Sequence, residues 1–103
     1  MKDKYLPIGT VCMLNGGTKR VMITGFCATP KEDKTKMYDY SGCIFPEGFL
    51  VSNQACLFNN DQIEKIYHMG LQDELHENFN KKLLKYSASK ESKNIFENEI
   101  IEL

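Results

Sequence analysis

The sequence has neither a surplus of charge of one sign nor a long apolar run. Its 13 Lys and Arg residues against 14 Asp and Glu residues give a formal net charge of -1, so no overall field would attract nucleic-acid phosphates or an anionic membrane. No stretch approaches the roughly 20 apolar residues of a membrane-spanning helix. The N-terminal sequence lacks the apolar segment of a signal peptide, because Pro7 and Gly9 interrupt it. We therefore expect a cytoplasmic protein that neither binds nucleic acid nor inserts into a membrane.

Clustered metal ligands and phosphate-binding loops are also missing. The cysteines are widely spaced, without a C-x-x-C pair or grouped histidines, which argues against zinc and redox motifs; they are Cys12, Cys27, Cys43 and Cys56. Each has apolar or strand-forming neighbours, which favours buried free thiols over disulfides. Gly16 and Gly17 are not followed by the G-K-[ST] of a phosphate loop. We expect no metal and no cofactor.

Two groups of residues carry chemistry that must be weighed against a structural role. Cys43 with His68 or His76 contains the elements of a thiol nucleophile and its base, but no local signature accompanies them. We favour a strand-rim position for His68 and an exposed helix position for His76. The carboxylates at positions 73, 74 and 77 more often complement a helix dipole than bind a cation. We predict no enzymatic activity, and a small enzyme using Cys43 is the least favoured alternative.

The strongest local signal is a β-hairpin near the N-terminus. Two apolar runs, 11–14 and 21–23, flank Asn15-Gly16-Gly17-Thr18. Asn-Gly and Gly-Gly provide the positive φ angles of a tight turn, so the runs are predicted to be antiparallel strands joined directly. Gly25, inside the second strand, should permit sharp coiling. Residues 1–5, which precede the hairpin, should be loose.

Further strands are expected between residues 37 and 69. Alternation with a period of two predicts a strand from Met37 to Phe45, with Tyr38 and Tyr40 on its core face. Short strands are expected at 49–51, where the support is weaker, and at 55–58. The pattern in 63–69 fits a helix or a strand, and we prefer one helical turn at 61–64 followed by a strand at 65–69.

An amphipathic helix is predicted from Gln72 to about Ser87. Apolar residues recur there every four positions among polar ones: Leu71, Leu75, Phe79 and Leu83. Acidic residues open this segment and basic residues close it, which complements the helix dipole. Residues 88–103 bring a second apolar set, which includes Ile95, Phe96, Ile100 and Ile101. This tail is expected to be helical, extended or ordered on binding.

Together these elements predict an α+β fold. We expect a small curled or barrel-like antiparallel sheet of about five strands, with the C-terminal amphipathic helix against one side. A chain of 103 residues suits a single core. The predicted domain therefore covers residues 1–87, and residues 88–103 form the tail.

Several sequence blocks, taken in order, carry a family resemblance. They are Leu6-Pro7-Ile8-Gly9-Thr10-Val11 with Gly16-Gly17, Val21-Met22-Ile23-Thr24-Gly25, Tyr38-Asp39-Tyr40-Ser41-Gly42-Cys43 with Pro46-Glu47-Gly48, and Phe58-Asn59 with Ile63, Gly70 and Asp73-Glu74. From about Leu6 to Phe79 the chain resembles a small family of uncharacterised domains of Gram-positive Firmicutes. These domains are encoded beside LXG toxins in type VII secretion loci.

The resemblance implies a cytosolic, non-catalytic accessory protein of toxin export. Such a protein would bind the N-terminal helical region of an LXG toxin, with other small helical export factors as possible further partners, and act as chaperone or targeting adaptor. The alternative is an immunity protein that neutralises the toxin's C-terminal domain. The candidate contact residues lie on the turn at 46–51, on the helix and in the tail: Pro46, Glu47, Phe49, Leu50, Leu71, Phe79 and Phe96.

Overall fold

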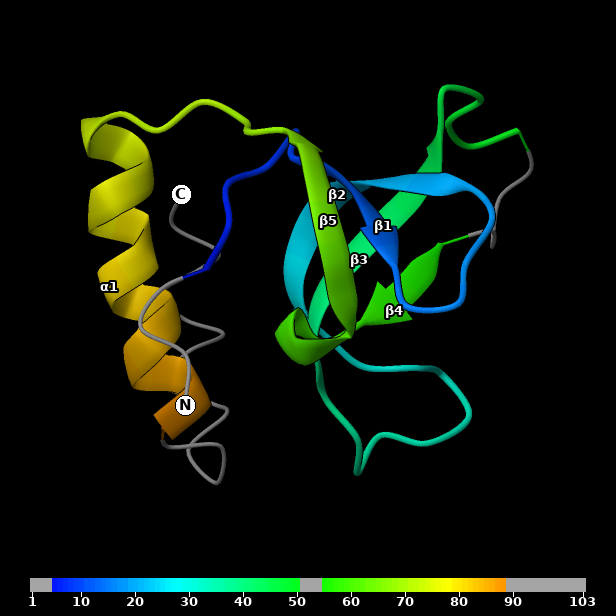
Figure 1. Ribbon diagram of the computed structural model, residues 1–103. Coiled ribbons are helices and arrows are strands. Elements are labelled where there is room, and N and C mark those ends of the chain that lie inside the picture. Colours follow the sequence, from blue (N-terminus) through cyan, green and yellow to red (C-terminus); the bar gives the residue numbers. More distant parts are fainter. Residues whose placement is uncertain (1–4, 51–54, 89–103) are drawn as a thin grey trace.

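In the described part of the chain, one antiparallel sheet and one α-helix make up the fold, as a computed structural model shows (Figure 1). The structure describes residues 5–50 and 55–88, so the predicted tail beyond Ala88, with its Phe96, lies outside the described residues. In chain order the elements are β1 (Val11–Leu14), β2 (Arg20–Ala28), β3 (Tyr38–Phe45), β4 (Cys56–Phe58), a 3-10 helix (Asn60–Gln62), β5 (Ile63–His68) and α1 (Glu74–Ala88).

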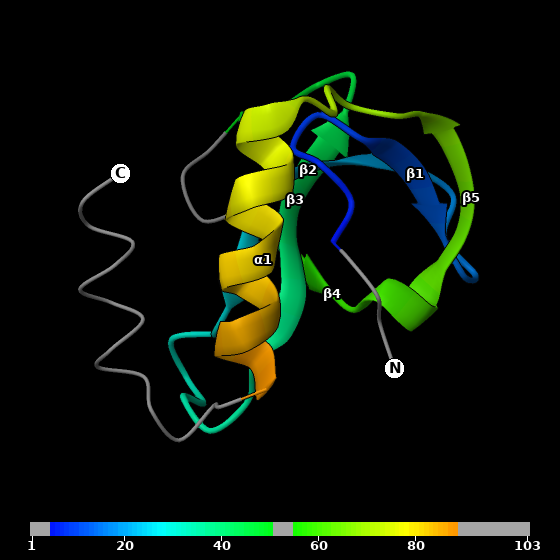
Figure 2. The same ribbon diagram turned by 90° about the vertical axis from the view of Figure 1, so that its left-hand side faces the viewer.

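The strands are ordered β4-β3-β2-β1-β5, and every pairing is antiparallel. The first four strands lie beside one another in chain order, whereas β5 returns to the far edge and pairs with β1. Figure 2 shows the sheet curling from β3 round to β5. The sheet stays open, because β4 and β5 form its two edges. The predicted α+β class, the five strands and the C-terminal helix are confirmed, and the curl stops short of a closed barrel.

The N-terminal hairpin forms as its turn sequence predicts. The Gly17 N–H donates to the Leu14 carbonyl oxygen at 2.9 Å, and Gly16 has a φ of +75°. Glycine adopts this left-handed conformation at little steric cost, which is why the chain can reverse here. The strands then pair from Met13 opposite Arg20 to Val11 opposite Met22.

Strand β2 pairs with β1 on one side and with β3 on the other, and its pairing with β3 is irregular. The β2–β3 register shifts between Ile23 and Gly25, where a Cβ on Gly25 would lie 2.7 Å from the Ser41 Oγ. Such an irregularity increases the local twist. The sharp coiling predicted at Gly25 therefore lies where the register shifts, and it directs Phe26 toward α1.

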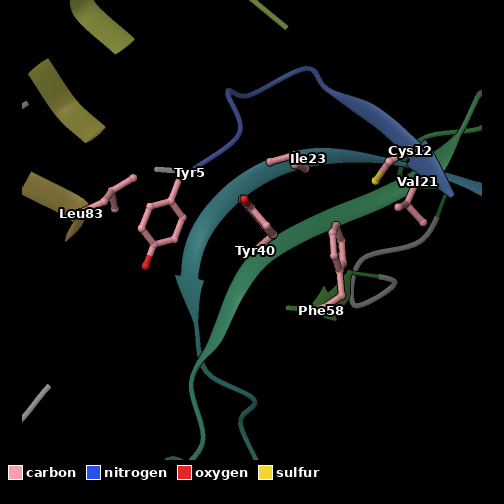
Figure 3. Packing of buried hydrophobic residues seen from close by; sticks show 7 residues of the cluster. All are labelled: Tyr5, Cys12, Val21, Ile23, Tyr40, Phe58 and Leu83. Carbon is pink, nitrogen blue, oxygen red and sulfur yellow. The ribbon is translucent and has the colours of Figure 1, made fainter. Parts of the chain in front are cut away.

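The core is a cluster of seven buried residues drawn from the sheet, α1 and the N-terminal segment: Tyr5, Cys12, Val21, Ile23, Tyr40, Phe58 and Leu83. Figure 3 shows Tyr5 between Leu83 of α1 and Tyr40 of β3. The Tyr5 and Tyr40 ring centroids are 5.8 Å apart in an edge-to-face arrangement, which adds to the stabilisation from burial. The expectation that residues 1–5 are loose is wrong for Tyr5, which is 1% exposed.

The structure departs from the sequence prediction at residues 49–50 and at the start of α1, and it decides between helix and strand for residues 63–69. Phe49 and Leu50 belong to no strand, so the weaker strand prediction at 49–51 fails for both. The 3-10 helix at Asn60–Gln62 passes directly into β5, which confirms a turn followed by a strand. Helix α1 begins two residues later than predicted, because the Asp73 Oδ1 accepts the His76 N–H at 3.1 Å and caps its first turn.

Candidate functional site

An open apolar groove of about 480 Å³ runs beside the first half of α1. Its walls come from the turn after the N-terminal segment, from β2, from the stretch before α1 and from α1 itself: Ile8, Phe26, Leu71, Asp73, Leu75, His76 and Phe79. The Phe26 and Phe79 rings lie 5.8 Å apart and join the helix to the sheet. Leu71 is 73% exposed and Leu75 is 79% exposed, so two large apolar side chains face solvent at this groove.

The N-terminal segment builds one wall of the groove by lying between α1 and the sheet (Figure 1). Its first described backbone N–H, that of Tyr5, donates to the Asn80 Oδ1 of α1 at 2.7 Å. The next one, of Leu6, donates to the Tyr40 hydroxyl at 3.0 Å. The Gly9 N–H then donates to the Ile23 carbonyl oxygen at 2.9 Å. These bonds tie the segment to both layers and leave Ile8 at the groove.

The chain that leaves β5 extends this wall through a close backbone approach. The Gly70 N–H donates to the Thr10 Oγ1 at 3.1 Å. A Cβ on Gly70 would collide with the carbonyl oxygen of Ile8, so only glycine fits here without displacement. This contact sets Leu71 next to Ile8, although 63 positions of sequence separate them.

The two halves of the helical apolar stripe have different surroundings. Leu83 is 1% exposed and belongs to the core, and Phe79 is half-buried against Phe26. Leu75, two turns earlier than Leu83, is almost fully exposed. Only the second half of the stripe therefore packs on the sheet, and the first half is left as the groove.

Charge is distributed unevenly along α1. Glu74 and Glu77 lie in the first turn, next to the capping Asp73. Lys81, Lys82 and Lys85 follow in the second half and are exposed. A helix that binds beside α1 would therefore meet acidic side chains at one end and basic side chains at the other, which favours one direction of docking.

The turn after β3 forms a second, separate patch. Pro46 lines a hollow of about 290 Å³ with residues of the β1–β2 connection and β2, and Glu47 forms an ion pair with Lys19. The hydrogen bond from Lys19 holds the pKa of the Glu47 carboxyl below its ordinary value. Phe49 is 52% and Leu50 is 74% exposed. This turn and α1 lie on opposite sides of the molecule (Figure 1).

The predicted contact residues thus fall into two groups that the structure keeps apart. Leu71 and Phe79 line the groove, whereas Pro46, Glu47, Phe49 and Leu50 lie on the distant turn. Phe96 lies outside the described residues. The predicted contact residues did not include the other five residues of the groove, Ile8, Phe26, Asp73, Leu75 and His76. The four-residue stripe already contained Leu75, but no local pattern indicated that Ile8 and Phe26 approach it.

The cysteines and histidines that were considered as catalytic candidates differ in how exposed they are. Cys43 is 4% exposed and Cys12 is fully buried, and burial raises the pKa of the Cys12 thiol to about 11. His68 is exposed on β5, whereas His76 is half-buried in the groove instead of lying on an open face. Among residues 5–50 and 55–88, no three His, Cys, Asp or Glu side chains are grouped so that they could hold a metal ion. No helix in these same ranges is long and apolar enough to cross a membrane.

Comparison with known proteins identifies one family. Residues 5–79 match the model described as "Domain of unknown function (DUF4176)". The match includes the hairpin, all five strands and the part of α1 that lines the groove. No curated protein and no solved structure matches the chain.

Proposed function

Because the chain belongs to the DUF4176 family, whose description assigns no function, we propose that it is a non-catalytic accessory protein of type VII secretion. In this proposal it acts in the cytoplasm of a Firmicute as chaperone or targeting adaptor for an LXG toxin. The resemblance of its sequence blocks to domains encoded beside such toxins supports the assignment to type VII secretion. The groove along α1 supports the binding role.

The exposed leucines of the groove are the observation that carries this proposal. Leu71 and Leu75 are each about three-quarters exposed. They line the groove together with Phe26 and Phe79, whose rings contact each other. Contiguous exposed apolar side chains mark surfaces that other molecules cover. An amphipathic helix binds such a groove through residues spaced three and four apart, which is the kind of surface that the helical N-terminal region of an LXG toxin offers.

A binding measurement with matched variants tests the role of the groove. Covering a side chain that is 79% exposed, as Leu75 is, contributes about 1 to 2 kcal/mol. We therefore expect Leu75→Glu to weaken binding of the toxin's N-terminal region by about five- to thirtyfold. Leu50→Glu changes a 74% exposed leucine of the turn after β3, which lies on the other side of the molecule from α1 (Figure 1), and should leave the affinity unchanged. Calorimetric titration measures both, and circular dichroism checks that both variants fold.

The two halves of the toxin separate the chaperone role from the alternative. A chaperone or targeting adaptor binds the N-terminal helical region, whereas an immunity protein binds the toxic C-terminal domain. Binding to the C-terminal domain alone would contradict the proposal. Loss of affinity in Leu50→Glu but not in Leu75→Glu would place the contact on the turn and contradict the groove.

A further inference from the structure

The outer edge of the sheet at β5 is a second interaction surface, separate from the groove and from the proposed function. We propose that β5 binds an extended acidic segment of another protein, which joins the sheet as a further strand beside β5. Acidic and apolar residues alternate in this segment. Three observations carry the proposal: an open strand edge, an exposed side chain on the core face, and two cations over one tyrosine ring.

The edge of β5 has backbone groups for another strand. In the described part of the chain, β5 is the last strand of the sheet and pairs only with β1. Its residues from Glu64 to His68 are exposed, and Figure 2 shows β5 at one end of the curled sheet. Edge strands present unpaired N–H and C=O groups, to which an extended peptide binds through backbone hydrogen bonds. The six residues of β5 offer about 20 Å of such an edge.

Ile66 leaves part of the core face uncovered at this edge. It lies opposite Cys12 of β1, which is fully buried, so both side chains point to the core face of the sheet. Ile66 is nevertheless 41% exposed, since no further strand flanks it in the described structure. An apolar residue on an added strand would place its Cβ about 5 Å from that of Ile66 and cover it.

The opposite face of β5 presents two cations to one aromatic ring. The guanidinium carbon of Arg20 lies 4.0 Å from the centroid of the Tyr67 ring, and the Lys65 Nζ lies 4.9 Å from it. Lys65 and Arg20 both pair with Met13 of β1, from either side. Because Met13 follows Cys12 in the strand, its neighbours lie on the face away from the core.

These two cations lack an anionic partner. Among residues 5–50 and 55–88, neither Arg20 nor Lys65 forms an ion pair. Stacking on a ring uses the flat face of a guanidinium and leaves its N–H donors available to a carboxylate. An acidic residue opposite Lys65 on an added strand would meet both cations. The two faces of β5 together therefore favour a segment with acidic residues on the side of Lys65 and apolar residues on the side of Ile66.

The same charges disfavour a second copy of the chain as the occupant. Two copies paired through β5 about a two-fold axis would bring both pairs of cations to the same face of the joined sheet. Like charges that face each other across strands are destabilising. Nucleic acid would meet the cations but has no peptide backbone to extend the sheet. An acidic extended peptide satisfies both features.

Titration of the full chain with synthetic hexapeptides tests the proposal. The probe is acetylated and amidated Glu-Val-Glu-Val-Glu-Val, which matches β5 in length, and its charge control replaces each glutamate by lysine. In amide NMR spectra, the acidic peptide should shift the resonances of Ile63–His68 and saturate them in the millimolar range or below, whereas the basic peptide should not.

A matched pair of protein variants tests the contribution of charge. Lys65→Glu should weaken binding of the acidic peptide about two- to thirtyfold, because it replaces an exposed ion pair by a repulsion. Lys81→Glu makes the same charge change at an exposed position of α1 and should leave the affinity unchanged. Circular dichroism checks that both variants fold.

N-methylation of the peptide separates strand pairing from simple attraction of charges. Alternate residues of a strand direct their N–H groups to the same neighbouring strand, so either the glutamate or the valine N–H groups face β5. One peptide carries methyl groups on all valine nitrogens and a second on all glutamate nitrogens. One of the two should lose binding and the other should keep it.

The proposal fails if the acidic peptide gives no saturable shift in β5, if both N-methylated peptides still bind, or if Lys65→Glu binds as tightly as the wild type. Resonances of β5 that shift on dilution of the protein alone would assign the edge to a second copy. A thymidine hexanucleotide that binds these residues more tightly than the acidic peptide would assign the cations to phosphate groups. Either result would overturn the acidic segment as occupant. No toxin enters these measurements, so their outcome is independent of the toxin titration.

Discussion

Replacement of Asn80 by alanine tests how the N-terminal segment is held against α1. Asn80 is 6% exposed, and its Oδ1 accepts the Tyr5 N–H at 2.7 Å. Removing the amide leaves a buried backbone N–H without its acceptor. This bond joins residues 75 positions apart, so its loss should loosen the wall that carries Ile8 as well as lower the stability of the fold.

The expected magnitude follows from a matched pair of variants in the same helix. A buried donor left without its partner costs about 1 to 3 kcal/mol. Asn→Ala also gains up to about 0.7 kcal/mol of helix propensity. Asn78→Ala makes the same substitution at an exposed position two residues earlier, so the propensity gain cancels in the comparison. Asn80→Ala should therefore be less stable than Asn78→Ala by about 1 to 3 kcal/mol.

Urea unfolding measures this difference if the two variants have equal m-values. The Tm of Asn80→Ala should also be at least about 4 °C below that of Asn78→Ala in a domain of this size. Hydrogen exchange provides a second readout, since the Tyr5 amide should exchange faster in Asn80→Ala than in the wild type. The reasoning is refuted if the two alanine variants unfold at the same urea concentration, or if the Tyr5 amide keeps its wild-type protection in Asn80→Ala.

Three further predictions concern close packing, ionisation and thiol access. A Cβ on Gly70 would collide with backbone, whereas nothing lies within 4 Å at Gly16, where only the φ of +75° is unfavourable. Gly70→Ala should therefore melt at a lower temperature than Gly16→Ala, and equal Tm values would contradict the close approach. Burial raises the pKa of Tyr40 from 10.0 to about 12, so its contribution to stability is complete below pH 10.0 and is lost as the pH rises toward 12. Between pH 10.0 and about 12, the free energy of unfolding measured in urea should fall less for Tyr40→Phe than for the wild type. An equal fall in the two proteins would contradict the raised pKa of Tyr40. Cys12 is fully buried and its pKa is raised, so at about pH 8 it should react with a thiol reagent only after unfolding. Its labelling in the native protein, located by mass spectrometry, would contradict the buried position.

The sequence predicted those elements whose signals are local. The Asn15-Gly16-Gly17 turn specified the hairpin because positive φ is a property of the turn residues themselves. The recurrence of apolar residues every four positions specified α1, whose observed range is Glu74–Ala88. Alternation identified β3 within one residue. The weak prediction at 49–51 failed for Phe49 and Leu50, because a short apolar run without alternation does not distinguish a strand from a turn.

The candidate site was predicted only in part, since its walls come from distant parts of the chain. Leu71 and Phe79 were chosen from the helical stripe and do line the groove. Ile8 and Phe26 were not chosen, because their approach depends on the Tyr5–Asn80 hydrogen bond and on the register shift in β2. The turn residues Pro46 to Leu50 were grouped with the helix in the prediction, but the fold places them on the opposite side.

The amino-acid sequence by itself determined the hairpin, the order of strands and helix along the chain, and the apolar stripe of α1, because these follow from backbone preferences and from periodicity over a few residues. Only the tertiary structure decided that Leu83 is buried while Leu75 remains exposed. The N-terminal segment and the sheet cover just the second half of the stripe. Burial depends on which distant residues arrive at a side chain, and a local pattern does not contain that information.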